Sequence, residues 1–365
     1  MKTLFLNIAA LTVCVLAQAQ TLNVNVNNVI DQYPAAEAGT MAYSNGATLT
    51  ILNKTYNLSE ITEMYTDESS VTANQVSVVY NGSEALVYVA ANVVPYVEVT
   101  VSGAKVSINQ KNTEAVDGDE ITYVLSGTST DGQFALGGSY KCTISLNNVT
   151  LTNASGAAVN ITNSKRIQLS AKKNTENTLA DCASGSQKAC VYSKGQLQLQ
   201  GNGTLNVTGN TKHGIKSGDY ITVKNLTLNI KGAAGDGISC NEYFQMKSGT
   251  VTISGMGDDG IQCDLDGTES TGEIAATDTT DAHEDEDSGN IYLEGGKLTI
   301  SPTADAAKGL KAAGDVKISG GTLTITQTGT LVASSDDLSY PTCIKADGNV
   351  AITGGTINIT NTADG

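Results

Sequence analysis

The sequence predicts an all-β protein whose larger part is a right-handed parallel β-helix with three strands in each rung of roughly 23 residues. The first observation is a repeat, because Gly214, Gly237 and Gly260 occupy the same place in similar segments and are 23 residues apart. The second is that apolar pairs two positions apart recur between these glycines, as on one face of a strand. The third is the composition: 38 glycines and 4 prolines are typical of many strands joined by glycine turns.

The first residues predict export. Lys2 precedes an apolar stretch at 4–16, and Ala17-Gln18-Ala19 fits a small-residue cleavage site, so residues 1–19 have the pattern of a signal peptide cleaved before Gln20. The apolar stretch is too short to span a bilayer, and no later stretch is apolar enough for a transmembrane helix. We therefore expect a periplasmic, cell-surface or extracellular protein.

The formal net charge of −16 limits the partners of the protein. A chain this acidic should repel nucleic acid and anionic lipid, so neither is an expected partner. It should instead attract divalent cations.

Residues 20–115 predict a small β-rich N-terminal domain. Segments at 48–52, 76–80 and 97–101 alternate apolar and polar residues and are separated by Asn-Gly and Ser-Gly turns, as in short strands. The polar stretch 110–119 suggests a boundary. The β-helix domain is then expected over 116–365.

Each predicted rung carries two strands besides the glycine-marked one, and their apolar pairs should face the interior. One strand contains Leu197/Leu199, Ile221/Val223, Phe244/Met246, Ile291/Leu293, Val316/Ile318 and Val350/Ile352, and the other Leu205/Val207, Leu228/Ile230, Val251/Ile253, Leu298/Ile300, Leu323/Ile325 and Ile357/Ile359. Successive rungs should pair in parallel. A β-propeller is disfavoured, because its blades have about 40 residues in four antiparallel strands.

The spacing changes after Gly260. The interval to Gly309 is 49 residues, and because only one set of strand patterns occurs in it, we interpret it as one rung with an insert. The sequence stops at Asp364-Gly365, which resembles the opening of another rung without the capping unit that normally closes a solenoid. We therefore expect the β-helix to be truncated.

Small residues form one inward register, in which Cys240 and Cys263 should be neighbours on successive rungs. The members of this column are Ser193, Ser217, Cys240, Cys263, Ala312 and Ala346. Cys240 and Cys263 could form a disulfide or pack as thiols, and Cys182 and Cys190 could also form a bridge.

Aspartates gather at the turn before the repeated glycines. Asp236, Asp258, Asp259 and Asp305 recur there, and neighbouring rungs lie about 4.8 Å apart, so their carboxylates should stack. Asp264 and Asp266 follow and begin an acidic insert. A Ca²⁺ ion with oxygen ligands would remove the repulsion within such a column. The alternative is that these are solvated turn aspartates, selected for backbone shape.

A second column should face outward, and it offers candidate carbohydrate-binding residues. It consists of Lys216, Ser239, Gln262, Lys311 and Lys345, of which Lys216, Gln262, Lys311 and Lys345 are the candidates. Exposed strand lysines also protect solubility and sheet edges, which is the alternative. With no tryptophan in the chain, affinity would depend on polar contacts, calcium and Tyr192, Tyr220 or Tyr292.

Catalytic patterns are sparse. The chain has two histidines, His213 and His283, and one arginine, Arg166, for which a surface charge is the expected role. Asp258 and Asp259 are adjacent, so on a strand they would point to opposite faces and make a poor acid/base pair.

The ordered motifs resemble a bacterial family of secreted carbohydrate-binding parallel β-helix proteins. They include His213-Gly214-Ile215-Lys216, Gly235-Asp236-Gly237-Ile238, Asp258-Asp259-Gly260-Ile261 and the closing Ile-x-Gly-Gly-Thr rungs, within residues 119 to 365. The resemblance implies binding of cellulose or polygalacturonate, and Ca²⁺ held by turn aspartates, here Asp236, Asp258 and Asp259.

We therefore expect non-catalytic binding of a plant-type or other acidic polysaccharide. The alternatives are a calcium-dependent polysaccharide lyase or glycosidase, and a structural surface protein or adhesin.

Overall fold

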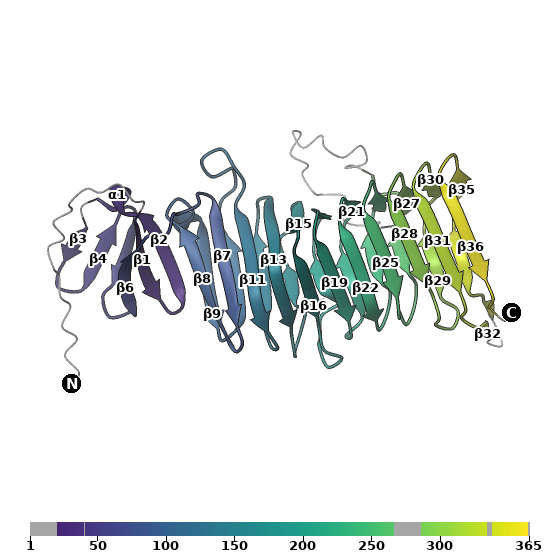
Figure 1. Ribbon diagram of the computed structural model, residues 1–365, viewed down its shortest axis with the longest axis horizontal. Helices are drawn as coiled ribbons and strands as arrows, with labels where there is room; N and C mark the ends of the chain where they lie inside the picture. The colour runs from purple at the N-terminus through teal and green to yellow at the C-terminus, as the bar shows by residue number, and fades with distance from the viewer. Residues whose placement is uncertain (1–19, 40, 266–285, 334–337, 364–365) are drawn as a thin grey trace.

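The computed structural model describes residues 20–39, 41–265, 286–333 and 338–363. The protein is an elongated stack of strands whose long axis runs from the N-terminal to the C-terminal end (Figure 1). Most of these strands pair in parallel, which is consistent with a β-helix-like fold. Among the described residues no helix is long and apolar enough to span a membrane. The expected signal peptide lies outside the described residues.

The N-terminal end is a small unit of mainly antiparallel strands. Strand β1 (Thr21–Val26) pairs with β2 (Val29–Pro34) and β6 (Glu63–Asp67), and the short helix α1 (Ala35–Ala38) follows β2. A separate antiparallel sheet contains β3 (Ala42–Ser44), β4 (Thr48–Ile51) and β5 (Lys54–Asn57). This unit has its own apolar cluster, which includes Leu22, Val24, Tyr33, Ile51 and Tyr56.

Parallel pairing begins before residue 115. Strand β7 (Gln75–Asn81) pairs antiparallel with β8 (Glu84–Ala90) but parallel with β11 (Thr122–Ser129). After the 3₁₀ turn η1 (Val94–Tyr96), strand β9 (Val97–Ser102) pairs with β10 (Lys105–Gln110), which runs parallel to β12 (Gln133–Gly138). One apolar core extends from Val76 to Cys343. The boundary predicted near residue 115 therefore falls inside a continuous core, because alternation in a single strand does not reveal its pairing partner.

Three faces follow from the pairing. Strand β13 (Cys142–Thr152) is long enough to pair with the first strand of two of them. The first face contains β15 (Ile167–Ala171), β18 (Leu197–Gly201), β21 (Ile221–Lys224), β24 (Tyr243–Met246), β27 (Asn290–Leu293), β30 (Val316–Ile318) and β35 (Val350–Ile352). The second contains β16 (Glu176–Ala180), β19 (Thr204–Gly209), β22 (Thr227–Ala233), β25 (Thr250–Ser254), β28 (Lys297–Ser301), β31 (Thr322–Gln327) and β36 (Thr356–Asn361).

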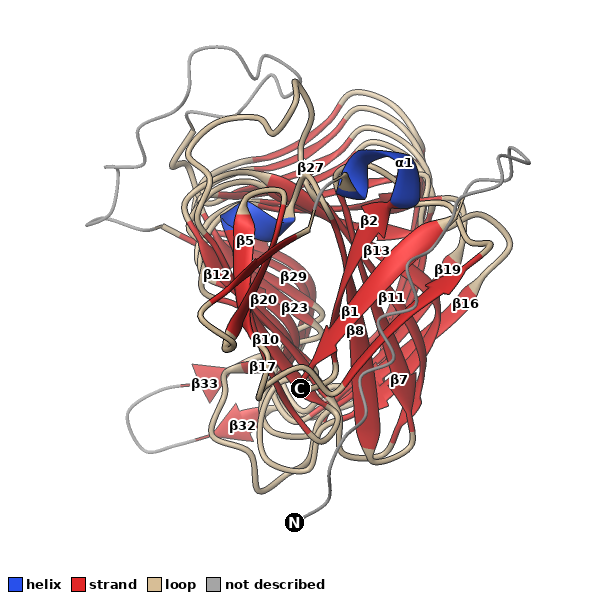
Figure 2. Cartoon of the chain, turned by 90° about the vertical axis from the view of Figure 1, so that its left-hand side faces the viewer, coloured by secondary structure: helices blue, strands red, loops and turns tan. Residues whose placement is uncertain are grey.

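The third face carries the glycine-marked strands. After β12 it contains β14 (Val159–Ile161), β17 (Ala189–Ser193), β20 (His213–Ser217), β23 (Ile238–Asn241), β26 (Ile261–Asp264), β29 (Lys308–Ala312) and β34 (Thr342–Ala346). Seen along the stack, the strands surround a common interior (Figure 2). A short antiparallel pair, β32 (Val332–Ala333) and β33 (Leu338–Ser339), projects near the C-terminal end.

The register agrees with the predicted repeat. Ile215 is the partner of Ile238, and Ile238 is the partner of Ile261. Ile261 is in turn the partner of Leu310, so β26 and β29 are neighbours with no strand between them. This confirms the interpretation of the long interval as one rung with an insert.

The predicted inward residues fill the core. Both apolar series are buried as far as Ile318 and Ile325, and so are Ser193, Ser217 and Cys240 of the small-residue column. Side chains on the last strands are more exposed, because no further described strand covers them. Val350, Ile352 and Ile359 are therefore exposed.

The six described cysteines are free thiols. Cys240 and Cys263 are register partners and both are buried. Their thiols therefore pack side by side without forming a disulfide bond. Burial raises the pKa of the Cys263 thiol well above its usual range. Cys182 and Cys190 do not form the bridge considered from the sequence.

Thiol labelling should therefore be selective. Cys182 is partly exposed, and a hydrogen bond with Ser184 lowers its pKa. Because thiolates are the reactive species, we expect dithionitrobenzoate to modify Cys182 in the folded protein and the buried thiols only in denaturant. The count of modified sites by peptide mass spectrometry checks this, and fast labelling of Cys240 or Cys263 would contradict their packing.

Candidate metal and carbohydrate site

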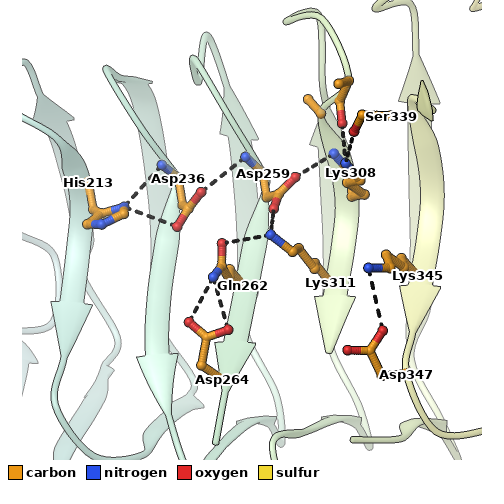
Figure 3. A network of polar contacts seen from close by, with 12 residues as sticks. His213, Asp236, Asp259, Gln262, Asp264, Lys308, Lys311, Ser339, Lys345 and Asp347 are labelled. Carbon is orange, nitrogen blue, oxygen red and sulfur yellow. Dashed lines mark hydrogen bonds and ion pairs between the residues drawn. The ribbon is translucent and has the colours of Figure 1, made fainter. Parts of the chain in front are cut away.

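A column of side chains caps backbone groups at the turn into the third face (Figure 3). His213, Asp236, Asp259 and Lys308 each directly precede a glycine on successive strands. The backbone N–H of Asp236 donates to Nδ1 of His213 (3.1 Å). The N–H of Asp259 donates to Oδ1 of Asp236 (3.1 Å), and the N–H of Lys308 to Oδ1 of Asp259 (2.7 Å). Each carboxylate therefore fixes the position of the next rung.

The two aspartates of this column are buried beside basic groups. Asp236 is 2% exposed and Asp259 is 0% exposed. Nδ1 of His213, which accepts the N–H of Asp236, lies 3.1 Å from Oδ2 of the same residue without donating to it, whereas Nζ of Lys311 lies 3.1 Å from Oδ2 of Asp259 as its ion-pair partner. Buried carboxylates need such partners, since an unpaired buried charge is strongly unfavourable. The column is thus less exposed than the sequence suggested, and Asp259 is ion-paired.

Asp258 completes an acidic trio with Asp236 and Asp259. One carboxylate oxygen of each lies within 4.8 Å of the others. Asp258 reaches solvent, yet partial loss of hydration, followed by the charges of Asp259 and Asp236, raises its pKa. The trio therefore concentrates negative charge at one exposed corner of the turn.

The donor set of the trio fits a hard divalent cation. Ca²⁺ prefers six to eight oxygen ligands, including carboxylates and water, and the exposure of Asp258 leaves room for water. Oδ2 of Asp259 is buried and accepts no hydrogen bond from the described residues. Its neighbour is the ammonium group of Lys311, with Nζ at 3.1 Å. A cation at the trio would therefore meet this ammonium group.

The other predicted metal residues lie elsewhere. Asp264, at the far end of β26, accepts hydrogen bonds from Nε2 of Gln262 at 2.7 and 3.0 Å. Asp305 is exposed and accepts one from the hydroxyl of Thr330. Lys308 occupies the position directly before Gly309, so Asp305 is not part of the trio. Asp266 lies outside the described residues.

The outer column has the register that the alternation predicts, although its member Ser239 is buried. Its members Lys216, Ser239, Gln262, Lys311 and Lys345 are successive register partners. Nζ of Lys216 donates to Asn241 Oδ1 (2.9 Å) and Ser239 Oγ (3.3 Å). Lys311 donates to Gln262 Oε1 (3.3 Å). Asn241 was not predicted, although its place one residue after the inward Cys240 indicates an outward side chain.

Comparisons with known proteins bear on this surface. A family model described as "Carbohydrate-binding domain-containing protein" matches residues 102–365. The chain belongs to this family. A relative of the same description from Acetivibrio thermocellus (strain ATCC 27405) is 29% identical over 119 residues, covering 28% of this chain and 42% of the relative. The chain therefore matches less than half of that relative.

A solved structure shares the fold of this carbohydrate-binding domain protein. It is the polysaccharide lyase-like protein from C. thermocellum, as a gadolinium derivative. The TM-score is 0.56 at 20% sequence identity, and the match covers 77% of this chain and 99% of that one. At this identity the likeness concerns the arrangement of the backbone.

Three further candidates in this carbohydrate-binding domain protein are buried. Arg166 is 6% exposed and pairs with Glu120, so the expected surface role is wrong. Glu120 is 46 residues from Arg166 in the sequence, so the local strand pattern could not reveal this partner. Tyr220 is fully buried and stacks on Tyr243, with ring centroids 4.8 Å apart. Tyr292 is 6% exposed. Tyr220 and Tyr292 are therefore packing residues, and neither offers an open ring face to a sugar.

Proposed function

We propose that the protein is an exported, non-catalytic binder of acidic polysaccharide, in which a right-handed β-helix with rungs of about 23 residues holds Ca²⁺ at the acidic trio. The observation that carries this proposal is the contact between the trio and the outer column through Lys311. Family membership supports carbohydrate binding. The structural neighbour is described as a polysaccharide lyase-like protein, which supports a polysaccharide as the ligand class.

The charges explain how an acidic protein could hold an acidic glycan. With a formal net charge of −16, the chain as a whole repels a polyuronate. A bound Ca²⁺ would supply positive charge at the trio and could coordinate carboxylates of the glycan. Lys216, Lys311 and Lys345 add positive charge along the outer column. Because these groups are charged, we favour a polygalacturonate-like ligand over neutral cellulose.

The geometry favours binding over catalysis. A lyase base must be deprotonated to remove a proton, whereas the pKa of Lys311 is raised. Arg166 is buried in its pair with Glu120. A glycosidase needs two available carboxyl groups, but both oxygens of Asp259 already face Lys308 and Lys311.

Retention on polysaccharide tests the proposal. We expect the purified protein to be retained on polygalacturonate gel in Ca²⁺ and released by EGTA. Asp258→Asn should weaken retention about tenfold, because it removes an exposed ligand that caps no backbone group. Asp305→Asn is the matched control, since Asp305 is also an exposed turn carboxylate outside the trio, and its retention should not change.

Three outcomes would contradict parts of the proposal. Equal retention in Ca²⁺ and EGTA would exclude a calcium-dependent ligand site. Retention on cellulose but not on polygalacturonate would exclude the acidic ligand. Release of unsaturated or reducing ends from either polymer would show catalysis and replace the binding role with an enzymatic one.

A further inference from the structure

Lys311 occupies the junction between the acidic trio and the outer column (Figure 3). It projects outward from β29 and is the register partner of Gln262 on β26. Its Nζ lies 3.1 Å from Oδ2 of Asp259 and 3.3 Å from Oε1 of Gln262. Its side chain is 33% exposed, so the ammonium group has a path to solvent. One side chain thus contacts both proposed binding surfaces.

The ammonium group of Lys311 responds to all three carboxylates of the trio. Burial lowers the pKa of Lys311, but Asp259, followed at longer range by Asp258 and Asp236, raises it above its ordinary value. The lysine is therefore a fixed positive charge at neutral pH. Its ammonium group therefore lies beside the position that a cation bound to the trio would occupy.

A divalent cation bound through Oδ2 of Asp259 would compete with this ammonium group for the same oxygen. Oδ2 of Asp259 is buried, and its partner is the ammonium group of Lys311, with Nζ at 3.1 Å. Oδ1 is already occupied by the N–H of Lys308. Two positive charges cannot both contact Oδ2 without repulsion. A cation bound through Oδ2 would therefore displace the Lys311 ammonium group.

We propose that Lys311 is an internal counter-cation of the acidic trio. A divalent cation displaces its ammonium group from Asp259 toward the exposed side of the outer column, where the group becomes available to an anionic group of the glycan. This inference rests on the proposed calcium site. No bond or proton is exchanged, because the lysine leaves as ammonium. By linkage, an anionic glycan that holds Lys311 outward strengthens cation binding to the same degree.

Titration calorimetry with Ca²⁺ alone tests this coupling. Lys311→Gln should bind Ca²⁺ about tenfold more tightly than the unaltered protein, within the usual range of coupling effects. Lys311→Arg retains the competing charge and should keep the original affinity. Lys345→Gln is the matched control, because Lys345 is the neighbour of Lys311 in the same column but pairs with Asp347 outside the trio.

Thermal melting gives a second measurement. Without its internal counter-cation, Lys311→Gln should melt lower than the unaltered protein in EGTA and gain more from added Ca²⁺. If the unaltered protein and Lys311→Gln bind Ca²⁺ equally and gain equally in melting temperature, the counter-cation role is excluded and the calcium site stands. If the unaltered protein and every variant fail to bind Ca²⁺, the calcium site itself is excluded, and this inference with it.

Discussion

Asp259→Ala should lower the stability of the stack by about 3 kcal/mol and abolish Ca²⁺ binding, because it removes one partner from a buried charge pair and a capped backbone group. The carboxylate of Asp259 is fully buried. Its removal leaves the N–H of Lys308 without its acceptor and Lys311 without its ion pair. The midpoint of urea unfolding, followed by circular dichroism, measures the loss of stability, and calorimetry measures the loss of Ca²⁺ binding.

Two variants separate the structural role of Asp259 from its role as a ligand. Asp259→Asn keeps an oxygen that can accept the N–H of Lys308, so it should lose Ca²⁺ binding with a smaller loss of stability. Asp258→Ala removes an exposed carboxylate whose raised pKa reflects unfavourable surroundings, so it should weaken Ca²⁺ binding without lowering stability. If Asp258→Ala and Asp259→Ala destabilise the protein equally, the distinction between a buried capping residue and an exposed ligand is wrong.

Because of the repeat, most of the stack of parallel strands was predictable from the sequence. A parallel stack places equivalent residues of successive rungs side by side, so aligning Ile215, Ile238 and Ile261 also gives their register. The same alignment gives the outer column and the trio. The N-terminal strands carry no repeat, and the parallel partner of β7, which is β11, therefore could not be found from alternation alone.

The electrostatic partners were not predictable in the same way. Long side chains reach across rungs, so the contact of Lys311 with Asp259 joins different positions of the repeat. His213 precedes the repeated Gly214 in the sequence, but its contact with Asp236 requires the column itself. Asp305 was misplaced because a turn in sequence can be several residues long, whereas only one position precedes the glycine. Lys308 holds that position and donates its N–H to Asp259.

Gly260→Ala should destabilise the protein by about 3 kcal/mol, because overpacking against backbone atoms cannot be relieved by a side-chain rotation. A Cβ at this position would lie 2.5 Å from the carbonyl oxygen of Gly309 and 2.5 Å from Cγ2 of Ile300. The strand would have to move away from β29, which carries Lys308 and Lys311. We therefore expect Ca²⁺ affinity to fall together with the melting temperature, although Gly260 offers no side-chain ligand.

Gly232→Ala is the matched control within the same stack. A Cβ at Gly232 would meet its nearest atoms at 3.7 Å, in ordinary van der Waals contact. Alanine there should be neutral or slightly stabilising, because it restricts the unfolded chain. Similar melting temperatures for Gly260→Ala and Gly232→Ala would show that the rungs at the trio are loosely packed. A large loss confined to Gly260→Ala would instead show that close approach of the rungs holds Asp259 beside Lys308 and Lys311, so that the repeated glycine, selected for packing, also sets the geometry of the cation site.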